Sequence, residues 1–121
     1  MSLPTVALLG TQAVLGLVGL GVGGAKVTRQ EDQVDDFRRF GYPPWFRTVT
    51  GVVEIAAGAG LIAGLLWSPG LTLAGGLLLS SVMVGAVVTH LRTGDPPSKT
   101  VVPATLFVLT AGLLAIRYLP V

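Results

Sequence analysis

The sequence predicts an all-α protein, a bundle of four transmembrane helices with a short amphipathic helix at the membrane surface between the first and the second. Only 12% of the 121 residues are charged, whereas soluble domains average about 25%, and the mean hydropathy is +0.76. Uncharged runs cover residues 1–25, 55–89 and 100–116. A soluble domain of this size has too little interior to bury such runs. We therefore expect a single integral-membrane domain over residues 1–121.

The first helix is expected over residues 3–25. A cleaved signal peptide is the competing interpretation, but Met1-Ser2-Leu3 lacks the basic residues with which such a peptide normally begins. Gln12, Gly16, Gly19 and Gly23 recur at alternating spacings of four and three, so they share one face of this helix. Small residues on one face allow a second helix to approach closely.

Residues 26–46 form the long polar connection. Val34, Phe37 and Gly41 recur at helical spacing among charged residues, which predicts a short helix lying on the membrane surface. Pro43-Pro44 is expected to end it and turn the chain. Five of the eight aromatic residues crowd into this region, and we expect them to be interfacial anchors: Phe37, Phe40, Tyr42, Trp45 and Phe46.

Three further helices are expected over residues 47–67, 71–91 and 101–119, joined by Ser68-Pro69-Gly70 and by a polar turn at 93–97. The last is expected to begin near Thr100, with Pro103 in its first turn. Four crossings put both termini on one side of the membrane. Seven of the eight basic residues lie in the connections 26–47 and 90–100: Lys26, Arg29, Arg38, Arg39, Arg47, Arg92 and Lys99. The positive-inside rule therefore predicts cytoplasmic connections and outward-facing termini, in a bacterial inner or plasma membrane.

Glu54 is the residue that does not suit its surroundings, because it lies within an otherwise apolar crossing. A charged group there costs a few kcal/mol unless it meets a partner or a wet cavity. We expect a polar pocket where the cytoplasmic helix ends meet, formed by Lys26, Arg47, Glu54, His90 and Arg92. Two interpretations stay open. The pocket could hold a proton, a quinone carbonyl or a lipid head group, or Glu54 could simply pair with Lys26, Arg47 or His90 and pin the helices together.

Glu54 and His90 are expected to share this pocket. The short Ser68-Pro69-Gly70 turn makes their helices antiparallel neighbours, and both residues lie near the cytoplasmic ends. Small residues accompany each of them on its helix face, namely Gly51 and Gly58 beside Glu54, and Gly76 and Ala86 beside His90.

Several kinds of chemistry are disfavoured by composition. The chain has no cysteine and one histidine, which falls short of a zinc ligand set, so no metal site is expected. Met83 and His90 lie on the same side of one helix, so they cannot clamp a haem iron between them. The net charge of +2 is too small to indicate a nucleic-acid partner. The GLGVGG segment follows no strand, so membrane-helix packing explains it better than a phosphate loop.

Two stretches resemble the DoxX-like family of small four-helix membrane proteins. They are FRRFGYPPWFRTVTGVVEIAAGAGLIAG, which follows Lys26, and VMVGAVVTHLRTGDPPSK. The most specific pieces are the aromatic Gly-Tyr-Pro turn leading into Gly-x-x-Glu, and the Thr-His-Leu-Arg end of the third crossing. The resemblance implies the four-helix membrane fold. The wider DoxX/DoxD group takes its name from a subunit of a thiosulfate:quinone oxidoreductase, other relatives are linked to membrane oxidoreductase complexes, and distant eukaryotic ones to membrane-protein assembly or cargo handling.

Two functional hypotheses follow. In the first, the chain is a subunit or accessory of a membrane oxidoreductase or quinone-linked system, with quinone as its cofactor and a membrane or peripheral redox protein as partner. In the second, it is a non-catalytic protein that binds lipid or helps other membrane proteins assemble. We also expect a homo-oligomer, because Gly19-xxx-Gly23 and Gly60-xxx-Gly64 exceed what one small bundle needs internally.

Overall fold

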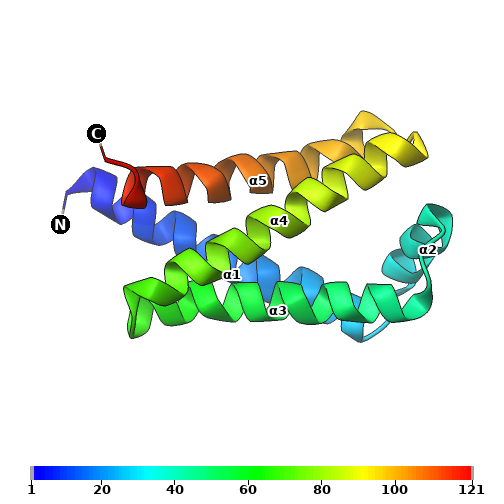
Figure 1. The fold of residues 1–121 in the computed structure, drawn as a ribbon, viewed down its shortest axis with the longest axis horizontal. Helices are drawn as coiled ribbons and strands as arrows, with labels where there is room; N and C mark the ends of the chain where they lie inside the picture. The colour runs from blue at the N-terminus through cyan, green and yellow to red at the C-terminus, as the bar shows by residue number, and fades with distance from the viewer. Residues whose placement is uncertain (1, 121) are drawn as a thin grey trace.

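A computed structural model describes residues 2–120 (Figure 1). Those residues form five helices and no strand: α1 (Leu3–Val27), α2 (Glu31–Phe40), α3 (Pro44–Leu66), α4 (Pro69–Thr93) and α5 (Pro97–Tyr118). All but α2 are long and apolar enough to cross a bilayer, since about 20 residues span its hydrocarbon core. The predicted fold class, four apolar helices with one short amphipathic helix after the first, is confirmed.

The helix ends differ from the expected ones because of prolines and one glycine. Gly41, with a φ of 82°, ends α2, so Pro43-Pro44 does not end that helix as expected. Instead Pro44 is the first residue of α3 and Pro97 the first of α5, where a proline's fixed φ suits the helix and its missing N–H costs nothing. Both helices thus begin three or four residues before the expected 47 and 101, and Pro103 lies inside α5 rather than in its first turn.

The two ends of the bundle are unlike (Figure 1). Both termini and the α3–α4 turn lie at one end, while α2 and the α4–α5 turn lie at the other. α3 and α4 meet at their turn and diverge toward the α2 end, and α5 follows α4 away from α1. The bundle is therefore wedge-shaped: α3 and α4 are close together at their turn and spread apart at the end where α2 lies.

Glycines set the close contact between α1 and α3. A Cβ added at Gly23 would lie 2.5 Å from the carbonyl oxygen of Gly51, and one added at Gly58 would lie 2.5 Å from that of Gly16. Such separations are far below van der Waals contact, so only hydrogen fits at these positions. The expected face of small residues on α1 is thus occupied by α3.

The glycines behind the expected homo-oligomer are also used inside the chain. A Cβ at Gly60 would lie 3.2 Å from the Cα of Gly75, and one at Gly64 would meet Thr72 of α4. Gly19 and Gly23 face α3. The premise that these motifs exceed the needs of one bundle is wrong, and self-association stays a prediction without that support.

A compact core lies among α1, α3, α4 and α5, made of Leu15, Ala57, Leu61, Leu79, Met83 and Leu113. One polar side chain is buried beside it. The amide of Gln12 donates hydrogen bonds of 2.8 Å to the carbonyl oxygen of Leu61 and to Oγ1 of Thr72. These bonds join α1 to both α3 and α4. They hold the three helices together in the half of the bundle that carries the termini.

Candidate functional site

The half of the bundle that carries α2 contains a cavity of about 820 Å³, to which all five helices contribute. Most of its wall is apolar, and four of its side chains are the aromatic residues Phe37, Phe40, Tyr42 and Phe46. Their rings pack mainly edge to face or tilted, with centroids 5.0 to 6.5 Å apart, within the range that such pairs prefer. This aromatic cluster covers the cavity where α2 meets α3.

A buried ion pair lies in the wall that α1 and α3 share. The Nζ of Lys26 is 2.9 Å from Oε1 of Glu54, and the two side chains are only 12% and 2% exposed. Both residues line the cavity. Oε1 is itself buried, and the Lys26 ammonium is its charged partner. The charge of the carboxylate is thus compensated by Lys26 within the cavity wall.

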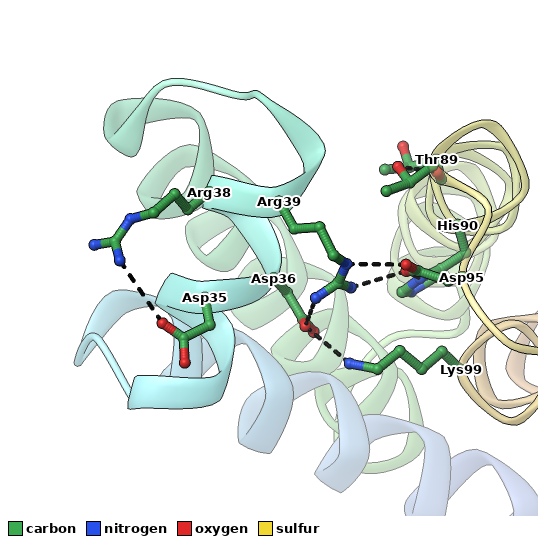
Figure 2. A network of polar contacts seen from close by, with 9 residues as sticks. Asp35, Asp36, Arg38, Arg39, Thr89, His90, Asp95 and Lys99 are labelled. Atoms are coloured by element: carbon green, nitrogen blue, oxygen red, sulfur yellow. Dashed lines mark hydrogen bonds and ion pairs between the residues drawn. The ribbon is translucent and has the colours of Figure 1, made fainter.

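A second polar group joins α2 to the start of α5, and we call it the latch: Asp36, Arg39, His90, Asp95 and Lys99 (Figure 2). Arg39 donates two hydrogen bonds to the Asp95 carboxylate, of 2.9 and 2.8 Å, and one of 2.9 Å to Asp36. Lys99 donates to the same oxygen of Asp36 at 3.0 Å. The Nδ1 of His90 lies 2.5 Å from Asp95.

Asp95 is the centre of the latch, and its side chain is only 4% exposed. Hydrogen bonds from Arg39, and then from His90, lower the pKa of Asp95 to about 2, because both donors favour the carboxylate form. The hydrogen bond to Asp95 likewise raises the pKa of Arg39 above its ordinary value. Asp95 and Arg39 are therefore both charged at neutral pH, and their ion pair holds α2 over the cavity.

A hydroxyl pair completes the wall beneath the latch. The hydroxyl of Tyr42 and Oγ1 of Thr89 are 2.9 Å apart and hydrogen-bonded. The Phe40 ring stands edge-on to the His90 ring, with centroids 5.3 Å apart. Phe40, Tyr42, Thr89 and His90 all line the cavity, so polar groups approach it from α4 as well as from the Lys26–Glu54 pair.

Of the five residues expected to form one pocket, three line the cavity, namely Lys26, Glu54 and His90. Arg47 and Arg92 do not line it. Glu54 pairs with Lys26, and His90 pairs with Asp95 rather than with Glu54. Arg47 lies beside a separate hollow, and Arg92 donates a 3.4 Å hydrogen bond to the Phe40 carbonyl and lies over the Tyr42 ring.

The five aromatic residues expected as interfacial anchors also differ in their exposure and in whether they line the cavity. Phe37 is 7% exposed and Trp45 is 65% exposed. Of the five, Phe37, Phe40, Tyr42 and Phe46 line the cavity, and Trp45 does not. A buried Phe37 is not an interfacial anchor, because its ring is covered by protein; the exposed Trp45 suits that role.

Sequence reasoning missed four residues of the latch: Asp36, Arg39, Asp95 and Lys99. A signal was present, since the two connections expected on one side of the membrane each carry acidic and basic residues.

Among residues 2–120 there is no group of three or more His, Asp or Glu side chains that could hold a metal ion. The cavity is suited to binding a largely apolar molecule that has hydrogen-bonding groups.

Comparison with known proteins gives two matches. The model of the DoxX-like family matches residues 5–113. A Bacillus subtilis (strain 168) protein, named "Uncharacterized protein YdgD", is 38% identical over 77 residues, which cover 64% of this chain and 67% of that protein. No solved structure matches this chain.

Proposed function

Since this chain belongs to the DoxX-like family, we propose that this small membrane protein binds a quinone-type molecule in the cavity under α2, as a subunit or accessory of a quinone-linked membrane oxidoreductase. The observation that carries the proposal is the cavity itself. At about 820 Å³ it lies in the range of small-molecule sites, roughly 300–1,000 Å³. Its aromatic wall offers ring faces and edges to a flat ring, and its apolar surface suits an isoprenoid chain.

Charge balance favours a neutral head group. The lysines and carboxylates that line the cavity are Lys26, Glu54, Asp36 and Lys99, and they are already joined as two ion pairs. An anionic head group would have to break one of these pairs to find a cation, whereas a neutral ring needs only hydrogen-bond donors. The Lys26 ammonium and the Tyr42 or Thr89 hydroxyl supply such donors to carbonyl oxygens.

Reduction of a quinone to a quinol takes up two electrons and two protons. The chain has no cysteine and a single histidine, so we assign the electrons to a partner redox protein, in the membrane or at its surface. The two protons come from water, and Glu54 and His90, which line the cavity, could each take up a proton and pass it to the ring. In this proposal the protein contributes binding and proton delivery rather than a redox centre.

Two glycines offer a matched test. Gly85 lines the cavity, Gly112 does not, and an added Cβ would meet nothing within 4 Å at either. The first atom of a side chain at either position therefore meets no neighbour. We expect wild type and Gly112→Leu to bind a short-chain ubiquinone in isothermal titration calorimetry, and Gly85→Leu to bind it at least about tenfold more weakly. Equal binding by the two variants, or no binding by wild type, would refute the proposal.

A non-catalytic role in neutral-lipid binding or membrane-protein assembly is the second candidate. Val102 favours it, because this apolar residue of α5 lines the cavity and is 58% exposed, so the cavity wall includes exposed apolar surface that a lipid chain could cover. Organic extraction of the purified protein distinguishes the two. A stoichiometric quinone supports the first candidate, and a neutral lipid without quinone supports the second.

A further inference from the structure

A second hollow, of about 370 Å³, lies where the turn after α1 meets the first turn of α3. Its lining residues are Arg29, Val34, Pro44, Trp45, Arg47 and Thr48, none of which lines the larger cavity. Two of the six are arginines and none is acidic. The hollow therefore differs in charge from the cavity, where cations and carboxylates are matched.

Arg47 is a buried cation without a counter-ion. It is 6% exposed, and its Nε donates a 3.2 Å hydrogen bond to the carbonyl oxygen of Lys26. That bond gives a hydrogen-bond donor to a carbonyl oxygen in the last turn of α1. Arg47 forms no ion pair with any of residues 2–120. A guanidinium has five N–H donors, so most of its donors are free. The terminal nitrogens of Arg47 are not among the buried atoms that lack a partner, and Arg47 lines the hollow, so these donors are available to an anion that enters it.

Arg29 supplies a second cation to the same hollow, and it too forms no ion pair within the described part of the chain. The turn holds it there: the backbone N–H of Arg29 donates to Lys26 at 3.3 Å, and that of Gln30 donates to Ala25 at 2.9 Å. This pair of backbone hydrogen bonds is the Schellman motif, with which many helices end at a glycine. Arg29 occupies the glycine position and adopts a φ of 60°. An arginine thus occupies a backbone position where glycine is the favoured residue.

The first turn of α3 adds to the positive potential. Pro43 caps this helix without a side-chain hydrogen bond, and no acidic residue lies in its first turn. The N-terminus of a helix carries a partial positive charge, which favours anions; here Pro43 and Pro44 supply no N–H donors, so the contribution is mainly this partial charge. Pro44, Trp45, Arg47 and Thr48 all belong to the start of α3 and line the hollow.

We propose that this hollow binds a phosphate-bearing anion, with Arg47 and Arg29 as its ligands and the N-terminus of α3 beneath it. Guanidinium groups suit phosphate because their N–H donors match its oxygens in pairs. The exposed Trp45 at the rim suits the head-group level of a bilayer. The anion can come from an anionic phospholipid or from free phosphate, and the experiment separates these sources.

Arg29→Gly is the decisive variant. It removes one ligand while placing the favoured residue at a positive φ, so the fold should be kept or slightly stabilised. The matched control is Arg38→Gln, which removes the same charge from a side chain that is 77% exposed and lies outside the hollow. The probes are short-chain phosphatidylglycerol, short-chain phosphatidylcholine and inorganic phosphate, titrated into the detergent-solubilised protein by calorimetry.

We expect wild type and Arg38→Gln to bind phosphatidylglycerol in preference to phosphatidylcholine, and Arg29→Gly to bind it about tenfold more weakly, which corresponds to the loss of one charged hydrogen-bond partner. Inorganic phosphate binding as tightly as the lipid, with the same loss in Arg29→Gly, would support the site and identify a soluble source. The proposal is overturned if neither probe binds wild type better than phosphatidylcholine, or if Arg29→Gly and Arg38→Gln behave alike. None of these outcomes depends on quinone binding.

Discussion

Lys26 at the end of α1 and Glu54 in the middle of α3 form an ion pair 2.9 Å long, in a wall where both side chains are nearly excluded from solvent. Glu54→Gln should lower the free energy of unfolding by about 3 kcal/mol, because it leaves the Lys26 charge buried without compensation. Lys26→Met combined with Glu54→Leu should recover most of that loss. Reversible unfolding in mixed micelles measures both.

His90→Ala provides the control for this pair. Because His90 contacts Asp95 and not Glu54, the destabilisation caused by Glu54→Gln and His90→Ala should add in the double variant. A strong coupling between them would contradict the separate pairing described above.

Protonation of Asp95 should open the latch in acid. Its pKa falls from an ordinary 3.8 to about 2 in the folded protein, so the unfolded chain takes up the proton first as the pH is lowered. The stability that the latch contributes is therefore fully present above about pH 4 and is lost as the pH falls toward 2.

The absence of cysteine makes this opening measurable by a single introduced thiol. Phe37→Cys places the thiol at the buried face of α2, where labelling should be slow at pH 5 and faster at about pH 1.5, below the pKa of Asp95, with an acid-active disulfide reagent. Asp95→Asn should label quickly at both pH values. A rate that is equally slow in Asp95→Asn would show that the latch does not hold α2 down.

Neighbouring glycines on α1 test the close contact with α3. Gly23→Ala should cost about 1–3 kcal/mol, because its Cβ would lie 2.5 Å from the carbonyl oxygen of Gly51. Gly24→Ala is the control, since nothing lies within 4 Å of a Cβ there, and it should be neutral or stabilising through helix propensity. Unfolding in detergent compares them, and equal costs would refute the contact.

The orientation in the membrane stays a prediction from the basic residues. A thiol introduced at Glu31, which is exposed at the start of α2, should be shielded in intact cells from a membrane-impermeant reagent. One introduced at Leu119, 63% exposed after α5, should react. The reverse labelling pattern would place α2 and the latch outside the cytoplasm.

The fold could be predicted because hydropathy reports directly on crossing a bilayer, and the crossing lengths follow from its thickness. The helix starts could not be placed as well. A proline can follow the end of one helix or begin the next, because its fixed φ suits both positions. The sequence around Pro44 and Pro97 does not decide between these two positions. The glycine face of α1 was recognisable, but whether α3 or a second copy covers it depends on packing that spacing alone does not determine.

Partner choice within the site was harder to predict for a related reason. Spacing placed Glu54 and His90 at similar depths, and both do line the cavity. Which carboxylate His90 meets depends on the rotation of α4 and on the course of the turn that follows it, and that turn brings Asp95 back to His90. The latch also joins α2 to residues more than fifty positions away in the sequence, a relation that local patterns do not contain.

The divergence of α1 and α5 toward the α2 end (Figure 1) has a consequence for how affinity at the cavity should be expressed. The occupancy of the cavity by a ligand that enters sideways from the lipid acyl chains depends on the mole fraction of that ligand in the lipid. The ligand's concentration in the aqueous buffer is related to this mole fraction only through the partition coefficient. Adding detergent dilutes such a ligand even when its total amount is constant. Occupancy should therefore fall as the detergent-to-protein ratio rises, and titrations at several ratios should converge on one curve when plotted against mole fraction.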